Sequence, residues 1–338
     1  MKLWKWQQLK TLKSGAKNLG WIVFLGGLVF GMSLPDVTLA QTKPKSESSE
    51  EDLKKVDDEI TNARMRADLG AAKRWSFNSS LSYNGSTLAR PADPLRPNIR
   101  RGSTVPDAST SLSGTVGVVH RIDKNNAFNL STGVNIFTPF AGDWTRTHIK
   151  NPTYQGKPGQ RREVQRINVA DPSLGYNHNR RIGDIQSITS MSIGAVTNPI
   201  TQQQLGMLGS FTIQQTLATQ QDKWTFGFYL TGATYFYEGS LNAQQRANET
   251  LFSAWITPFM EYQFTDLIGW RAVFNYFAWD YLKNAPKNEA YSFFTPQNST
   301  GVMFSVSRDV WLYPNVQFLP FNLRSDLTNW GVSTIINL

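Results

Sequence analysis

The chain contains no cysteine and only three histidines among its 338 residues. Without cysteine, disulfides, thiolate metal sites and cysteine nucleophiles are excluded. Charged residues are scarce, at 17% of the chain, whereas an ordinary soluble domain has roughly 25%. Glycine-rich phosphate loops, Asp-x-Asp calcium spacings and zinc-binding arrangements are also missing. We therefore expect no metal ion and no cofactor. What the chain does have is aromatic residues, at 12%.

The formal net charge of +9 is concentrated at the start of the chain. Residues 1–40 hold five lysines and one aspartate, which leaves a charge of +5 on residues 41–338. Nucleic-acid binding requires a concentrated basic stripe. The charge is too small and too dispersed for that function, so we expect no nucleic-acid partner.

The first forty residues have the layout of a secretory signal peptide. Five lysines up to Lys17 precede an apolar run of fourteen residues from Trp21 to Leu34, and small residues follow up to Ala40. A membrane helix needs about 20 apolar residues. We therefore predict a signal peptide over residues 1–40, cleaved between Ala40 and Gln41, with an uncleaved anchor as the alternative.

From Trp75 onward apolar and polar residues alternate with a period of two. In residues 75–83, Trp75, Phe77 and Leu81 share one parity, while the other parity holds serine and asparagine. The same division recurs down the chain. It predicts about twelve strands, near residues 74–84, 110–120, 126–137, 171–178, 184–196, 206–218, 223–237, 250–264, 268–281, 300–307, 311–320 and 329–338.

The connections between these strands alternate between short and long. Residues 121–125, 179–183, 220–222, 266–267 and 308–310 form brief turns, whereas the other links are longer and polar. Short periplasmic turns opposite long extracellular loops, with an even number of strands, are typical of outer-membrane barrels. The fold class predicted for residues 74–338 is therefore all-β, a transmembrane antiparallel up-and-down barrel.

The last predicted strand carries a further signal. Trp330, Val332, Ile336 and Leu338 share one parity. In this respect the chain resembles the outer-membrane β-barrel superfamily, whose last strand is an alternating apolar signal for the barrel-insertion machinery. The superfamily usually ends on an aromatic residue, and Leu338 departs from that pattern. The resemblance implies a Gram-negative outer membrane, with membrane lipid, lipopolysaccharide and the insertion machinery as partners.

Residues 41–73 form a polar segment that precedes the barrel on its periplasmic side. Ser48 and Glu51 have capping-box spacing, and apolar residues then recur at three- and four-residue intervals: Leu53, Val56, Ile60 and Ala63. This pattern predicts one amphipathic helix of about 20 residues, ending near Gly70. Its apolar stripe would pack into the barrel mouth, pair with other copies or meet a periplasmic partner. A mobile extension is the remaining alternative.

The inward parity of the predicted strands is rich in serine, threonine, asparagine, glutamine and glycine, with Glu261 and Arg271 as its clearest charges. These two residues lie on neighbouring strands at similar distances from one turn, so we expect them to pair across the inner wall. Such a nearly neutral lumen favours a narrow passive pore for small polar solutes, without strong anion selectivity.

Two other functions stay open. One is a structural or adhesive surface role through basic extracellular loops, whose residues would lie against lipopolysaccharide phosphates: Arg90, Arg96, Arg100, Arg101, Arg146, Lys150, Lys157, Arg161, Arg162 and Arg166. The other is lipid processing, because His178 resembles the histidine of outer-membrane phospholipases. In that family a serine nucleophile follows two residues later, and here position 180 is arginine. We therefore expect no enzyme activity.

Aromatic residues near the predicted strand ends have the distribution of interfacial girdles. Trp224, Trp255, Trp270, Trp279, Trp311 and Trp330 belong to this set, together with Tyr262 and Tyr313. A carbohydrate-stacking role is the sharper interpretation of any single one, but a girdle explains the whole set more simply.

Overall fold

The chain folds into a closed antiparallel β-barrel. The computed structural model describes Leu53 and residues 55–97, 107–151, 162–275, 277–284, 291–293 and 297–338. The signal peptide and its cleavage site at Ala40 and Gln41, predicted above, lie outside these residues. Twelve strand segments cross the barrel. In chain order they are β1 (Trp75–Thr87), β4 (Ser111–Arg121), β5 (Asn126–Phe137), β8 (Ile167–Ile182), β9 (Ile185–Ala195), β10 (Met207–Gln221), β11 (Trp224–Tyr237), β12 (Thr250–Gln263), β13 (Ile268–Asn275) continued by β14 (Phe277–Leu282), β16 (Gln297–Ser307), β17 (Val310–Phe318) and β18 (Asn329–Asn337).

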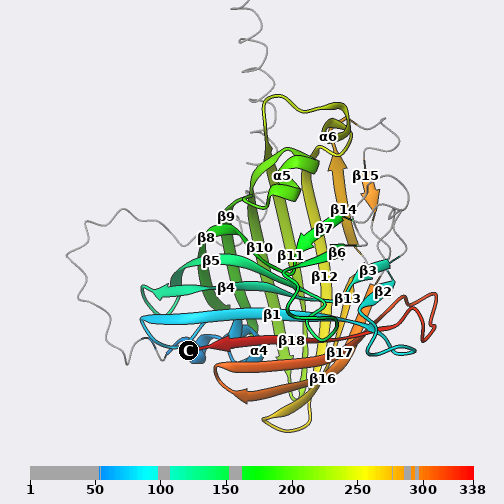
Figure 1. Ribbon diagram of the computed structural model, residues 1–338. Helices are drawn as coiled ribbons and strands as arrows, with labels where there is room; N and C mark the ends of the chain where they lie inside the picture. The colour runs from blue at the N-terminus through cyan, green and yellow to red at the C-terminus, as the bar shows by residue number, and fades with distance from the viewer. Residues whose placement is uncertain are drawn as a thin grey trace, which may run out of the picture. The chain divides into compact units, whose positions relative to one another are not determined.

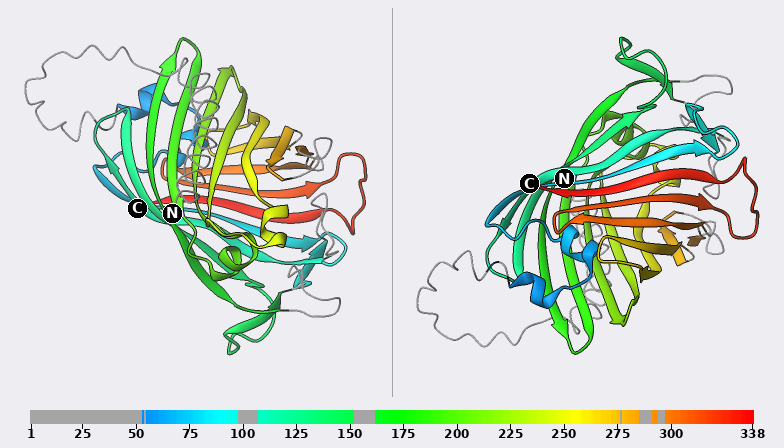
Figure 2. Two further views of the ribbon diagram at one scale, coloured as in Figure 1. Left: turned by 90° about the horizontal axis from the view of Figure 1, so that it is seen from above. Right: turned by 90° about the horizontal axis from the view of Figure 1, so that it is seen from below.

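Each strand pairs with its neighbours in the chain, and the first pairs with the last. β1 is hydrogen-bonded to β4 on one side and to β18 on the other, and the β11–β12 pairing completes the ring. Figure 1 shows β18 beside β1, and the two views in Figure 2 show the strands around the lumen. The predicted fold class, with twelve antiparallel strands, is confirmed.

The two ends of the barrel differ in the length of their connections. At one end, here called the short-turn end, the strands are joined by turns such as Gly183–Asp184 and Asp222–Lys223, and β1 begins and β18 ends there. The opposite, long-loop end carries small elements of its own: β2 (Leu95–Pro97), β3 (Asp107–Ser109), β6 (His148–Asn151), β7 (Arg162–Gln165), α5 (Pro199–Leu205), α6 (Ala243–Ala247) and β15 (Tyr291–Phe293).

The outer face of the barrel is apolar. Leu130, Val169 and Phe226 are among many large apolar side chains that remain exposed on it, Leu130 to 62%. Because a bilayer rather than water solvates such a band, this is the face of a membrane-spanning barrel. Among the described residues, no helix has the length and apolar character needed to cross a bilayer.

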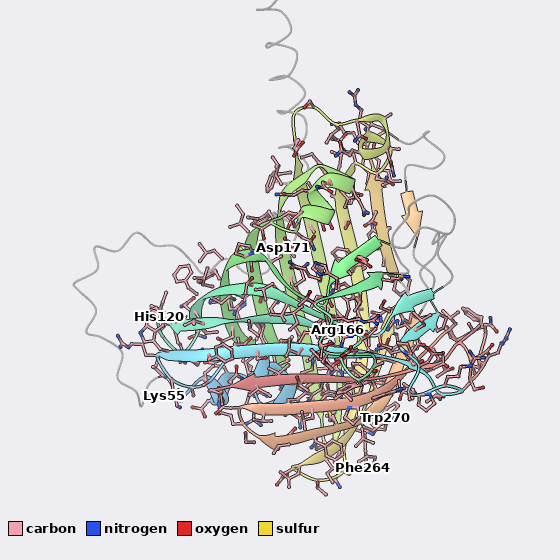
Figure 3. The ribbon with its side chains drawn as sticks, viewed as in Figure 1. Lys55, His120, Arg166, Asp171, Phe264 and Trp270 are labelled. Carbon is pink, nitrogen blue, oxygen red and sulfur yellow. The ribbon has the colours of Figure 1, made fainter. Side chains whose placement is uncertain are left out.

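Aromatic rings gather on this outer face at the short-turn end. The ring of Trp224 lies 4.7 Å from that of Tyr262 and 6.4 Å from that of Trp270, measured between centroids. Figure 3 labels Trp270 and Phe264 in this lower part of the barrel. Rings at this level match the interfacial girdle expected from the sequence.

Three aromatic residues assigned to the girdle face the lumen instead. Trp311 and Tyr313 are only 2% and 4% exposed and pack with Met303 inside the barrel. Trp255 pairs with Thr231 and shares its face of β12 with Glu261. The prediction failed for these residues because it used their distance from strand ends and ignored their parity.

The segment before β1 fills the short-turn end of the lumen. It contains α3 (Val56–Glu59) and α4 (Ala63–Asp68), whereas the sequence predicted one helix of about 20 residues. The chain is extended at Ile60 and Asn62, and the Asn62 side chain caps α4. The backbone amides of Thr61 and Asn62 donate to the Gln186 side chain on β9 at 2.8 and 2.9 Å. Because the wall takes these two amides, the helix is interrupted there. Leu53 and residues 55–72 are called the plug below.

Candidate functional site

An ion pair on the inner wall lies at the contact between the wall and the plug. Glu261 on β12 and Arg271 on β13 are direct cross-strand partners, and both are 2% exposed. The Arg271 guanidinium donates to the Glu261 carboxylate, so the two predicted lumen charges do lie together. A buried ion pair is stable only if further hydrogen bonds replace the lost water.

Those further hydrogen bonds come from the plug and from two tyrosines. The Asn62 side-chain nitrogen donates to Glu261 Oε2 at 2.6 Å. The second guanidinium nitrogen of Arg271 donates to the Tyr229 hydroxyl at 2.9 Å, and the Tyr313 hydroxyl donates to the Arg271 carbonyl at 3.2 Å. The ion pair is therefore more than a brace within the wall, because it also binds the plug.

Asn62 links the wall to the internal structure of the plug. While its nitrogen contacts Glu261, its side-chain oxygen accepts a hydrogen bond from the Met65 amide at 3.0 Å. This second bond caps α4, whose first amides lack partners within the helix. A single side chain thus both caps the helix and attaches it to the wall.

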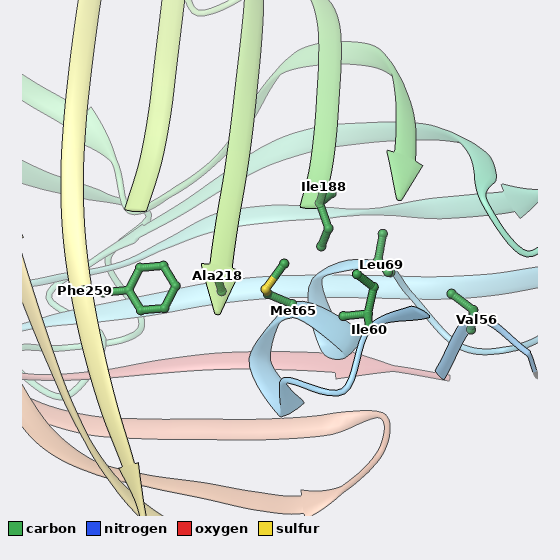
Figure 4. Close-up of a cluster of buried hydrophobic side chains, with 7 residues drawn as sticks. All are labelled: Val56, Ile60, Met65, Leu69, Ile188, Ala218 and Phe259. Carbon is green, nitrogen blue, oxygen red and sulfur yellow. The ribbon is translucent and has the colours of Figure 1, made fainter. Parts of the chain in front are cut away.

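The apolar face of the plug is buried against the strands. Val56, Ile60, Met65 and Leu69 form a cluster with wall residues Ile188, Ala218 and Phe259, as Figure 4 shows. Ala67 belongs to a second cluster with Met303, Trp311, Tyr313 and Ile335. The amphipathic stripe expected from the sequence therefore packs inside the barrel, which was one of the four alternatives left open.

Charged contacts surround this apolar core. The carboxylates of Asp57 and Glu59 pair with Arg308 and Lys124 at 2.9 and 2.8 Å. These pairs are partly exposed to water, and such pairs contribute about 1 kcal/mol or less. We conclude that they orient the plug more than they stabilise it.

Two arginines bind the end of α4. Arg121 is almost fully buried and donates to the Leu69 carbonyl at 2.7 Å, while Arg308 donates to the Gly70 carbonyl at 2.9 Å. Gly70 has a φ of 84°, a left-handed conformation that suits glycine, and it turns the chain from α4 towards β1. Cations at the C-terminal end of a helix interact favourably with its exposed carbonyls.

Within α4, Arg64 and Asp68 form an ion pair at 3.2 Å. Burial raises the pKa of the Asp68 carboxyl, and the nearby Arg64 opposes that shift. The Arg64 guanidinium also lies over the rings of Tyr229 and Trp311, 4.9 and 5.5 Å from their centroids. The plug therefore contacts the wall through cation–π contacts as well as hydrogen bonds.

Above the plug, towards the long-loop end, the lumen is lined by small polar side chains. The register places on this inner face Ser80, Ser82, Ser113, Thr115, Ser131, Ser190, Ser192, Thr212, Gln214 and Ser333. Among the inward-facing strand residues described there, one is charged, Asp280 on β14.

At the level of the plug, a cavity of about 240 Å³ lies between the plug and the wall beside Glu261.

The basic loop residues that the structure describes belong to several separate elements of the long-loop end. Arg96 lies in β2 and Lys150 in β6, whereas Arg100, Arg101, Lys157 and Arg161 lie outside the described residues. The side chain of Arg162, at the start of β7, is not described either. Arg90 is within 4.0 Å of Asp93, and the Arg146 amide donates to the Asp143 carbonyl.

Arg166 departs from the expectation of a solvated loop residue, because it is only 4% exposed. Its guanidinium lies 4.7 Å from the centroid of the Trp144 ring. Its backbone amide donates to the Thr147 carbonyl at 2.8 Å, so it is part of the folded loop structure. The charge pattern of the sequence does not indicate this contact between Arg166 and the Trp144 ring.

His178 is held by hydrogen bonding on the outer face. Its Nδ1 lies 3.0 Å from the Asn126 side-chain oxygen, which also accepts from the Tyr176 hydroxyl at 2.5 Å. Position 180, where the phospholipase pattern requires serine, carries Arg180. The serine nucleophile of that pattern is therefore missing at its position.

Sequence reasoning missed Asn62, Gln186, Tyr229 and Arg121. Tyr229 and Gln186 fall on the inward parity of their strands, which was a usable signal. Arg121 ends β4 next to a predicted turn, and nothing in its sequence position indicates that it contacts Leu69.

No protein-family model matches the chain, and no curated protein sequence matches it either. Solved structures do resemble it. An outer membrane channel from Pseudomonas putida F1 is 11% identical, with a TM-score of 0.47 over 80% of this chain and 98% of that one. The NanC porin is 8% identical, with a TM-score of 0.40 over 76% and 98%. Outer membrane phospholipase A from Escherichia coli is 11% identical, with a TM-score of 0.34 over 77% and 89%.

Proposed function

We propose that this outer-membrane-type barrel is a pore for small polar solutes in the outer membrane of a Gram-negative bacterium, with the plug at its periplasmic end. One observation carries this proposal: above the plug, hydroxyl and amide side chains line the inner face. Such a lining exchanges hydrogen bonds with water and polar solutes at little cost. A barrel with a purely structural role would gain nothing from a continuous polar path.

The plug determines when this path is open. Because it fills the short-turn end and is bonded to several strands, solutes pass only when it moves or leaves. We therefore expect low conductance from residues 41–338 and steady conductance from a version that begins at Trp75. Both are measured as single channels in a planar bilayer, and heat-modifiable gel migration checks that each barrel is folded.

A pair of cysteine variants tests the path itself, since the native chain has no cysteine. Ser192 faces the lumen on β9, whereas its neighbour Ile193 is 55% exposed on the outer face. In the version that begins at Trp75, a charged thiol reagent should reduce the current through S192C and leave I193C unchanged. Equal effects at both positions would contradict conduction through the lumen.

A non-conducting surface role is the competing function. It is favoured by the number of bonds that hold the plug and by the folded hairpins of the long-loop end. Folded barrels that stay silent both with and without the plug would establish this alternative over the pore.

A further inference from the structure

One inner wall of the lumen carries an aromatic residue with small neighbours. Trp255 on β12 pairs with Thr231 on β11 and with Ala278 on β14, so it faces the lumen between two short side chains. Trp255 is only half-buried. Neither of its cross-strand partners is large enough to cover an indole ring. An aromatic ring that is partly exposed in a polar channel is a platform on which a flat apolar surface can stack.

A hydrogen-bonding group lies beside this platform. Ser253, two residues from Trp255 on the same face of β12, is buried and donates to the Asp280 carboxylate, so it holds that carboxylate near the ring. The Tyr235 hydroxyl donates to the Ser253 hydroxyl at 3.1 Å. Two residues along a strand are about 7 Å apart, which is close to the width of one sugar ring. Aromatic and polar contacts are therefore spaced for a single ligand unit.

The charge distribution restricts what the ligand can be. Asp280 is the one charged side chain among the described inward-facing strand residues above the plug. An anion that reached Trp255 would meet this carboxylate. A ligand with an apolar face and many hydroxyl groups suits both the ring and the hydrogen-bonding group.

We propose that Trp255, Asp280 and Tyr235 form a binding subsite for neutral carbohydrate inside the lumen. A sugar ring would stack its C–H face on the indole, while its hydroxyl groups bond to the Asp280 carboxylate and the Tyr235 hydroxyl. This inference rests on the proposed pore function and names its solute class. In such a channel a weak subsite is useful, because solutes must leave as well as enter.

In the described part of the chain, the plug does not contact the subsite. The plug contacts β12 at Phe259 and Glu261, and Trp255 lies four residues, or about 13 Å, further towards the long-loop end. Binding can therefore be measured on the full chain, independently of whether the pore conducts.

Saturation-transfer NMR on the full chain in detergent micelles tests the proposal, because this method detects millimolar binding. The probes are glucose, galactose and maltohexaose, with glucuronate as the anionic counterpart of glucose. We expect saturation of the neutral sugars at their ring C–H protons, and little saturation of glucuronate. In W255A, affinity should fall about tenfold, in keeping with the loss of one aromatic contact.

Three further variants sharpen the test. Trp279 lies on the neighbouring strand β14 with outward parity, so W279A should bind the sugars like the wild type. W255F retains a ring and should restore most of the affinity lost in W255A, whereas D280N should weaken binding while leaving the barrel intact.

Two results would overturn the subsite. One is wild-type protein that saturates glucuronate as strongly as glucose, and the other is W255A that binds like the wild type. Either could occur in a barrel that conducts ions, so the failure of this inference is distinct from the failure of the pore.

Discussion

Asn62 is the residue whose loss should loosen the plug most selectively. In N62A, α4 loses its cap, which costs about 1 kcal/mol. The buried Glu261 carboxylate also loses the 2.6 Å hydrogen bond from Asn62, at a cost of about 1 to 3 kcal/mol. Together these losses favour the released plug by about 2 to 4 kcal/mol, a factor of roughly 30 to 700 in the docking equilibrium.

Hydrogen exchange measured by mass spectrometry reports this equilibrium directly. Where the plug opens and closes faster than exchange occurs, the exchange rate follows the open fraction. We therefore expect the amides of residues 61–69 to exchange roughly 30 to 700 times faster in N62A. The amides of the barrel strands, which the substitution does not touch, should exchange as in the wild type.

Two variants separate the cap from the contact with the ion pair. N62D keeps a capping oxygen but places a second carboxylate against Glu261, so it should also speed exchange in the plug. T61A removes only an exposed side-chain bond of 3.3 Å to Gln220 and retains the backbone bond to Gln186, so it should change little. Wild-type exchange in N62A and N62D would refute the role assigned to Asn62.

Three smaller predictions follow from other contacts. Because burial raises the pKa of the Asp68 carboxyl, the ionised form of Asp68 is penalised in the docked plug. Docking of the plug should therefore weaken as pH rises above about 4. In D68N, the open fraction of the plug measured by hydrogen exchange should depend less on pH. E59Q breaks the partly exposed ion pair between Glu59 and Lys124. Hydrogen exchange of the plug amides should become faster by about fivefold or less. Added salt should reduce the difference in exchange rate between E59Q and the wild type. R166M removes the cation over Trp144, so limited proteolysis should cut this loop faster in R166M while the barrel bands persist.

The barrel could be predicted from sequence because its physical cause is local. A strand that faces lipid on one side and a polar lumen on the other must alternate, and connections of unequal length identify the two ends. Residues 126–137 show how closely this works, since the predicted boundaries and those of β5 are the same. The break in the plug had no such local cause. Its helix ends near Ile60 because Gln186, more than a hundred residues away, takes the amides of Thr61 and Asn62.

The ion pair shows a second limit of sequence reasoning. Parity and distance from a turn were enough to expect that Glu261 and Arg271 would pair. They gave no indication that Asn62 would complete the site, because the register of a strand fixes its neighbours in the sheet but not what fills the barrel. The misassigned Trp311 and Tyr313 have the same origin. Aromatic residues near a strand end serve an interface when they face outward, and they pack against a plug when they face inward.

Charge is divided unequally along the lumen, and this affects how a pore would behave once the plug moves. The plug level holds Glu261, Arg271 and Arg121, whereas the described strand residues that face the lumen above it include one charge, Asp280. An anion crossing the upper lumen loses part of its hydration and meets a carboxylate, which is costly in a narrow, low-dielectric space. A neutral polar solute exchanges water for hydroxyl groups and avoids that cost. For the pore proposed above, ionic conductance therefore underestimates permeability, and uptake of neutral solutes is the more sensitive assay.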